Sequence, residues 1–203
     1  MTLDTADDRT IFFDMLPISL TVPTGSSHDF TLRVRAFSVP GQAVHATTRK
    51  VVLQGADGVV FVADSRLEET QANAASFAEL RAYLTDLGHG DASLPIVMQF
   101  NKRDLFEIRS DQELSTLAAS SIEPVFRATA TRGEGVRETF LALTATMLAG
   151  NYRRYPLQET LGLDAYAATN AIAQALGWNM DVARCMQASV ANSLILSRDT
   201  THE

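Results

Sequence analysis

Two short apolar runs constrain the fold of this 203-residue chain most strongly. Residues 58–64 and 96–100 are apolar almost throughout, which is typical of strands buried on both faces of a parallel sheet. Between them, apolar residues recur at helical spacing over residues 77–87, and Gly88 is suited to end that helix. Strands that alternate with helices predict a doubly wound α/β sheet, in which ligands bind at the carboxyl ends of the strands.

The flanking segments extend this pattern. Residues 11–16 and the alternating residues 30–36 predict an antiparallel hairpin at the sheet edge, with Pro17 breaking the first strand. Residues 124–128 predict a third short buried strand, and an apolar face recurs over residues 136–147. Between the second and third buried strands, Ser110 and Glu113 have the spacing of a capping box for a short helix.

The pattern changes after position 150. Residues 151–156 form a polar connector, and residues 164–176 and 181–196 are helical candidates with one apolar stripe each. We therefore divide the chain into a domain of residues 1–150 and a C-terminal helical extension of residues 151–203. A helical hairpin packed on the domain is favoured over a docking arm.

Composition narrows the class of protein. The net charge of −7 argues against a nucleic-acid-binding protein. The single cysteine, Cys185, excludes an intramolecular disulfide and suits a buried helical position in a cytoplasmic protein. Residues 1–8 do not resemble a signal peptide, and no apolar stretch approaches the roughly 20 residues that span a bilayer. The histidines lack metal-ligand spacing, which argues against a metal enzyme: His28, His45, His89 and His202.

The second apolar run is followed by an Asn-Lys-x-Asp motif, made of Asn101, Lys102 and Asp104. The carboxylate of such a motif can accept two N–H bonds from the edge of guanine, whereas adenine presents the wrong pattern. The loop after the third strand holds Thr129 and Ala130, and in a guanine site the Ala130 N–H donates to the base carbonyl. Taken alone, that segment is more simply an ordinary strand-to-helix loop.

Residues suited to a phosphate and a metal ion lie at two earlier strand boundaries. Gly41 lets a backbone N–H approach a γ-phosphate, and Gln42 is placed to orient a water for in-line attack. A Pro-Gly turn is the simpler interpretation of that corner alone. The Thr10 hydroxyl can complete Mg²⁺ coordination, and Arg9 can neutralise charge on the transferred phosphoryl group.

With these motifs in this order, the chain resembles the MglA group of bacterial Ras-like small GTPases. The resemblance covers about residues 3–148 and is carried by residues 8–17, 39–42, 49–50, 55–65 and 101–105. It implies a three-layer Ras-like sheet of the P-loop NTPase type and a GTP-hydrolysing switch in cell polarity and motility. It also implies GTP or GDP with Mg²⁺, and a roadblock-type activating partner, MglB.

The resemblance assigns individual roles as well. Arg9 corresponds to the intrinsic arginine finger, Thr10 to the switch threonine that binds Mg²⁺, and Gln42 to the catalytic glutamine. The Asn-Lys-x-Asp motif corresponds to the guanine-binding set. Ser38 stands where the family carries a threonine, which is a similar hydroxyl.

One part of a GTP site is missing from the sequence. No Gly-x-x-x-x-Gly-Lys-[Ser/Thr] motif occurs, and neither Lys50 nor Lys102 is placed to supply one. The family places a strand, this P-loop and a helix ahead of the stretch matched by residues 3–10. We therefore expect an N-terminally incomplete fold with exposed apolar edges.

Two explanations fit this gap: an upstream portion lost from the gene product, or a genuine P-loop-less relative. Retention of the other site residues favours the first. The function is accordingly an MglA-like switch with impaired or absent GTP hydrolysis, or a non-catalytic pseudo-GTPase that docks on roadblock or other polarity proteins.

Overall fold

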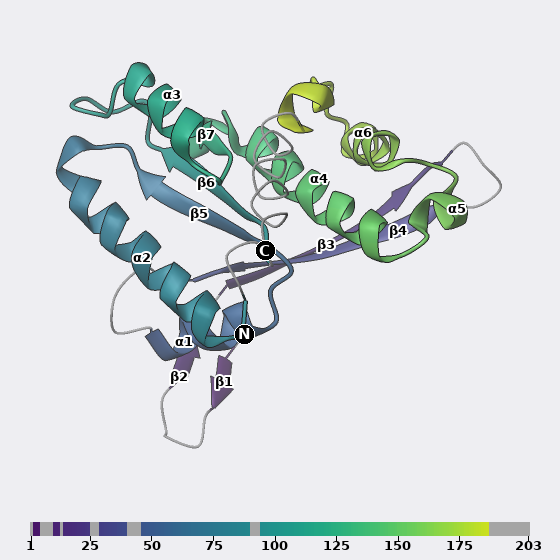
Figure 1. The fold of residues 1–203 in the computed structure, drawn as a ribbon, viewed down its shortest axis with the longest axis horizontal. Helices are drawn as coiled ribbons and strands as arrows, with labels where there is room; N and C mark the ends of the chain where they lie inside the picture. The colour runs from purple at the N-terminus through teal and green to yellow at the C-terminus, as the bar shows by residue number, and fades with distance from the viewer. Residues whose placement is uncertain are drawn as a thin grey trace, which may run out of the picture.

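The computed structural model describes residues 2–4, 10–12, 14–24, 29–39, 46–89 and 94–186. A parallel sheet in the order β5–β6–β7 is built from Val59–Asp64, Ile96–Asn101 and Val125–Arg127 (Figure 1). The register places Asp64 opposite Asn101, so polar residues meet at the carboxyl ends of β5 and β6. The predicted α/β fold is confirmed.

The end of the helix after β5 and the start of the helix after β6 lie where the sequence predicted them, although the first of these helices begins seven residues before the predicted apolar repeat. Helix α2 spans Thr70–Asp86, and Gly88 follows it with a φ of 82°, in the left-handed region that favours glycine. Helix α3 spans Asp111–Ser120. The capping box is present at its start, with the Glu113 N–H donating to Ser110 Oγ and the Ser110 N–H donating to the Glu113 carboxylate.

Helix α4, Val136–Arg154, packs against β5 and β6. Its approach to β5 is close, because a Cβ at Gly58 would lie 2.9 Å from the Leu143 side chain. The helix also runs further than predicted: residues 151–154, which we took for a connector, form its last turn. The nearest helix breaker is Pro156, and nothing before it stops the helix.

Strand β6 is buried as predicted. Ile96, Met98 and Phe100 pack into clusters with side chains of α2 and α3. Val97, which points to the opposite face, is also fully buried. This strand is therefore the rigid base from which the Asn-Lys-x-Asp motif emerges.

Strand β5 differs from the prediction that it is buried on both faces. Within the described residues it forms a ladder only with β6, so its other edge has no strand beside it. Val62 is 54% exposed as a result, while Ala63 on the opposite face is buried. An apolar run alone cannot distinguish a central strand from one with a covered and an open side.

The predicted hairpin forms, but its boundaries differ, and among the described residues it is a separate two-stranded sheet rather than an edge of the parallel sheet. Strand β3, Asp14–Val22, pairs antiparallel with β4, Phe30–Ser38. Pro17 lies inside β3 rather than ending it, which an outer strand tolerates because no further ladder needs its missing N–H. A separate ladder, which the sequence did not predict, pairs β1 (Thr2–Asp4) with β2 (Thr10–Phe12).

Helix α1, Ala46–Gln54, was not predicted and packs beside α2. Arg49 forms an ion pair with Glu79 of α2 at 2.9 Å. Lys50 forms one with Asp86 at 3.2 Å, between two well-exposed side chains.

The C-terminal extension packs on the domain. After the short helix α5, Leu157–Leu161, helix α6 spans Ala165–Ala175 and lies beside α4 and the β3–β4 hairpin (Figure 1). Ile172 of α6, Leu141 of α4 and Val22 of β3 are all fully buried in one core cluster. This arrangement matches the packed alternative rather than the docking arm.

The next helix starts at the predicted place. The Asp181 carboxylate accepts the Arg184 N–H at 3.1 Å, and residues 182–186 are helical. The rest of this predicted helix, residues 187–196, lies outside the described residues. Cys185 is buried as predicted, and burial raises the pKa of its thiol. Among the described helices, none combines the length and apolar character required to cross a bilayer.

Candidate functional site

The Asn-Lys-x-Asp motif forms a tight corner directly after β6. Lys102 adopts a φ of 64°, and its carbonyl accepts the Leu105 N–H at 3.2 Å. The turn leaves Asp104 exposed, and its carboxylate makes no side-chain hydrogen bond or ion pair with any other described residue. An exposed carboxylate without an internal partner is available to accept hydrogen bonds from a ligand.

A second loop, residues 128–135, is joined to this corner by two hydrogen bonds. The Ala130 N–H donates to Asn101 Oδ1 at 2.9 Å, and the Arg103 N–H donates to the Ala128 carbonyl at 3.1 Å. Thr129, by contrast, is buried, and its N–H donates to the Glu134 carbonyl at 3.0 Å. The predicted base-binding loops therefore lie together at the end of the sheet.

The Ala130 N–H, predicted to donate to a base carbonyl, is engaged in this structure. Because Asn101 Oδ1 already accepts it, a base carbonyl at Ala130 has to share or displace that hydrogen bond. Asn101 thus ties the second loop to the Asn-Lys-x-Asp corner.

Arg103, the variable residue of the motif, anchors the corner to α3. Its guanidinium donates to the Arg109 carbonyl at 2.5 Å and to the Asp111 carboxylate at 2.9 Å. Arg127, at the end of β7, donates to the same Asp111 carboxylate at 2.8 Å. Charge-assisted hydrogen bonds therefore hold the corner against the start of α3.

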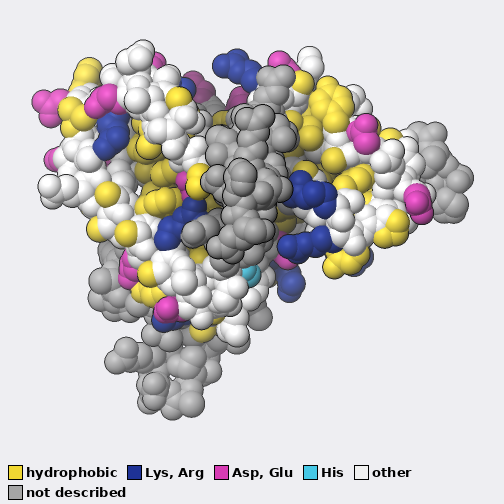
Figure 2. All heavy atoms as spheres, viewed as in Figure 1, with side chains coloured by type: hydrophobic (Ala, Val, Ile, Leu, Met, Phe, Trp, Pro, Cys, Tyr) yellow, Lys and Arg dark blue, Asp and Glu magenta, His cyan; other side chains and the backbone are white. Residues whose placement is uncertain are grey.

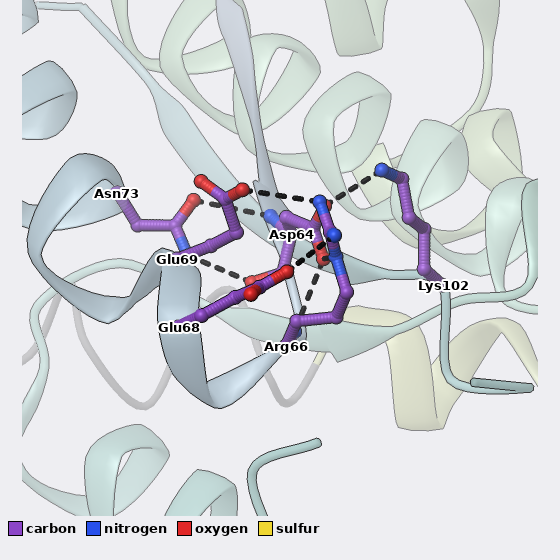
Figure 3. Close-up of polar contacts among 6 residues, drawn as sticks. All are labelled: Asp64, Arg66, Glu68, Glu69, Asn73 and Lys102. Atoms are coloured by element: carbon purple, nitrogen blue, oxygen red, sulfur yellow. Dashed lines mark hydrogen bonds and ion pairs between the residues drawn. The ribbon is translucent and has the colours of Figure 1, made fainter. Parts of the chain in front are cut away.

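A polar cluster that the sequence did not predict lies at the end of β5 (Figure 3). Lys102 Nζ lies 2.6 Å from Asp64 Oδ2, and Arg66 donates to both oxygens of the same carboxylate through its side chain. Arg66 in turn pairs with Glu68 and Glu69. The signal was Asp64 itself, a charged residue that closes an apolar strand. Arg66 lies two positions further on, whereas Lys102 comes from a separate loop, which sequence spacing does not reveal.

Asp64 is strongly biased toward its charged form. The hydrogen bonds from Arg66, followed by those from Lys102, hold the pKa of the Asp64 carboxyl well below its usual range, although partial burial acts in the opposite direction. A carboxylate with two cations beside it is a fixed negative charge at the site across the physiological pH range.

This shift predicts how stability changes in acid. A lowered folded-state pKa stabilises the protein above the unfolded-state value of about 3.9, and that contribution is lost as pH falls below it toward the folded-state pKa. We expect Asp64→Asn to be destabilising at neutral pH, and the difference from the wild type to shrink between about pH 5 and pH 2. Urea unfolding of both proteins across this range measures the difference, and a pH-independent difference contradicts the prediction.

The predicted phosphate-side residues are not placed by this structure. Arg9, Gly41 and Gln42 lie outside the described residues. Thr10 begins β2, but its side chain is outside the described part, and Ser38 ends β4 with an exposed side chain. The described side chains include no group of three or more His, Cys, Asp or Glu residues suited to hold a metal ion.

Comparison with known proteins gives one clear relationship. No model of a known protein family matches the chain. The chain is 39% identical over 148 residues to the mutual gliding-motility protein MglA of Myxococcus xanthus (strain DK1622), over 73% of this chain and 74% of that protein. Identity at this level over most of both chains, together with the α/β fold and the Asn-Lys-x-Asp corner after β6, establishes the family. This chain belongs to the MglA family of Ras-like small GTPases.

Proposed function

We propose that this chain binds guanine nucleotides at the carboxyl ends of β6 and β7, as an MglA-like switch in motility and polarity. The observation that carries the proposal is the joined pair of loops. Asn101 ties the two predicted base-binding segments together, and Asp104 projects an exposed carboxylate at the same corner. Two charge-assisted hydrogen bonds to this carboxylate select guanine over adenine.

GTP hydrolysis, where it occurs, depends on residues assigned by resemblance. Gln42 orients the attacking water, Arg9 stabilises the charge that develops on the phosphoryl group, and Thr10 contributes to Mg²⁺ binding. The 203-residue sequence contains no P-loop motif to hold the phosphates. We therefore propose weak GTP binding and very slow hydrolysis for this chain by itself.

The same gap supports a second function, that of a non-catalytic pseudo-GTPase. A protein that keeps the surface of the family without its phosphate site can still dock on a roadblock-type MglB-like protein. Nucleotide-independent co-purification with such a partner supports this second function. Binding that requires GTP supports the switch instead.

We also propose that the chain acts in the cytoplasm and does not bind nucleic acid. Its net charge is −7, and phosphate backbones attract clustered Lys and Arg. On the face shown in Figure 2, Lys and Arg side chains stand among acidic and apolar ones rather than in one continuous basic surface.

The guanine assignment is tested by Asp104→Asn. This change keeps the shape of the side chain but removes the charge, and we expect affinity for GDP to fall about tenfold to a hundredfold. Equilibrium dialysis with labelled GDP and ADP measures the preference for guanine. Glu107→Gln, in the same exposed loop, is the matched control and leaves the affinity unchanged. Equal affinities of the wild type for GDP and ADP contradict the assignment.

A further inference from the structure

The chain contains two lysines, and the structure holds them in different ways. Lys50 pairs with Asp86 at 3.2 Å, and the exposed fractions of the two side chains are 46% and 64%. Lys102 pairs with Asp64 at 2.6 Å, where the carboxylate is only 15% exposed. An ion pair between two exposed side chains restrains neither of them strongly. A largely buried carboxylate that is itself held in place restrains the flexible lysine that pairs with it.

Asp64 is fixed from both its backbone and its side chain. Asn73 of α2 brackets the backbone, accepting the Asp64 N–H at 3.1 Å and donating to the Asp64 carbonyl at 2.7 Å. Arg66 donates its own backbone N–H to Asp64 Oδ1 at 3.0 Å and its Nη2 to Oδ2 at 2.9 Å. The carboxylate that meets Lys102 therefore has little freedom to move.

Arg66 alone does not balance the negative charge of this cluster. The Arg66 guanidinium contacts both carboxylate oxygens of Asp64 and also pairs with Glu68 and Glu69, so one cation faces three carboxylates. The Lys102 ammonium is the second cation of the cluster, and the negative charge that Arg66 leaves unbalanced draws it to the Asp64 carboxylate. Figure 3 shows the Lys102 side chain extended toward Asp64, where its ammonium meets the same carboxylate that Arg66 contacts.

The two segments are also joined through their backbones. The Arg109 N–H donates to the Ser65 carbonyl, and the Leu67 N–H donates to the Glu107 carbonyl, each at 2.8 Å. The loop that carries the Asn-Lys-x-Asp corner is thus fastened directly to the residues that flank Asp64. The Ser65 N–H also donates to the Asn101 carbonyl at 3.0 Å, so the residue after Asp64 is joined to the corner itself.

We propose that Asp64, held by Arg66 and Asn73, is a positioning residue that orders the Lys102 side chain for guanine binding. The proposal rests on the proposed guanine-binding function. A free lysine loses side-chain entropy when a ligand orders it, and the pair with Asp64 removes that loss before the base arrives. Asp64 itself does not touch the base.

The first test probes the ion pair between Lys102 and Asp64 in the absence of nucleotide. The full chain, and its Asp64→Asn and Asp86→Asn variants, are acylated with an N-hydroxysuccinimide ester of acetate, and the two lysines are quantified by peptide mass spectrometry. We expect Asp64→Asn to accelerate acylation of Lys102 about three- to tenfold while Lys50 keeps its rate. Asp86→Asn leaves Lys102 unchanged and is the matched control. An unchanged rate at Lys102 in Asp64→Asn overturns the proposal.

The second test asks whether Asp64 acts through Lys102. GDP and ADP affinities are measured by equilibrium dialysis for the wild type, Asp64→Asn, Lys102→Met and the double variant, all shown to be folded by circular dichroism. We expect Asp64→Asn to weaken GDP binding about three- to tenfold in the wild-type background and to have no effect in the Lys102→Met background. A purely structural role of Asp64 gives the same loss in both backgrounds and overturns the proposal.

The outcomes separate this inference from the function on which it rests. If the wild type does not prefer GDP over ADP, the guanine assignment fails and the base-positioning role fails with it, even where acylation shows the contact. If the preference is present and Asp64→Asn leaves it intact, only the positioning role is wrong.

Discussion

Replacing Gly135 by alanine is expected to destabilise this protein by about 3 kcal/mol or more. Gly135 has a φ of 74° and immediately precedes α4. A Cβ at this position would overlap the Arg127 carbonyl oxygen and press on the Ala128 backbone. Both are backbone groups next to β7, so the overlap cannot be relieved by turning a side chain. Urea unfolding followed by circular dichroism measures the loss.

Gly133 provides a matched control for this prediction. Its φ of 73° is almost the same, but a Cβ there would meet nothing within 4 Å. Gly133→Ala therefore isolates the left-handed backbone penalty, about 1 to 2 kcal/mol. Equal losses for the two variants contradict the claim that backbone overlap dominates at Gly135.

Gly135→Ala is also expected to affect the proposed guanine-binding site. Ala128 and Gly135 bound the loop that carries Ala130, whose N–H donates to Asn101. A shift of the Ala128 backbone moves that donor relative to the Asn-Lys-x-Asp corner. We therefore expect Gly135→Ala to reduce the preference for GDP over ADP even at temperatures where the protein is folded.

Local signals in the sequence predicted local structure well. The capping box at Ser110 and Glu113, the end of α2 before Gly88 and the N-terminus of α6 at Asp164 depend on residues within one helical turn. The residues that give these signals also make the stabilising contacts, because the capping groups satisfy backbone N–H or C=O groups nearby. The Asn-Lys-x-Asp corner was found for the same reason, since all of its residues are adjacent.

Features that depend on distant segments were missed or misjudged. The burial of β5 was overestimated because the apolar run does not show whether another strand lies beside it. The cluster of Asp64 with Lys102 joins residues 38 positions apart, and only the parallel register of β5 and β6 brings them together. The engagement of the Ala130 N–H by Asn101, 29 positions away, likewise depends on the packing of two loops.

The Asn-Lys-x-Asp corner is fixed by contacts with other segments of the fold. Asn101, Lys102 and Arg103 are each bonded to a different neighbouring segment, through Ala130, Asp64 and Asp111 respectively. Only Asp104 within this motif is left exposed without such a bond among the described residues. Three residues of the motif therefore fix the corner, and the fourth, Asp104, is available to a ligand.

Replacing Ile172 by alanine is expected to lower the free energy of unfolding by about 2 to 5 kcal/mol, which is a loss of roughly 10 °C in Tm. Ile172 is fully buried in α6, in a cluster shared with Leu141 of α4 and Val22 of β3. Removing its side chain leaves a cavity between three elements that are distant in sequence. Gln174→Ala, at an exposed position on the same helix, is the control and changes stability by about 0.5 kcal/mol or less.

Two probes decide whether the C-terminal extension folds together with the domain. Trp178, the single tryptophan, lies just after α6 and stacks edge-on against Phe140 of α4 with ring centroids 5.7 Å apart, so its fluorescence reports the extension. Far-ultraviolet circular dichroism reports all the helices and strands. Since the core cluster joins α6 to α4 and β3, we expect both signals to shift together in Ile172→Ala. A shift confined to the fluorescence would show instead that the extension is an independently unfolding arm. In a shared core, a cavity weakens the packing of every element that lines it, so both signals would change.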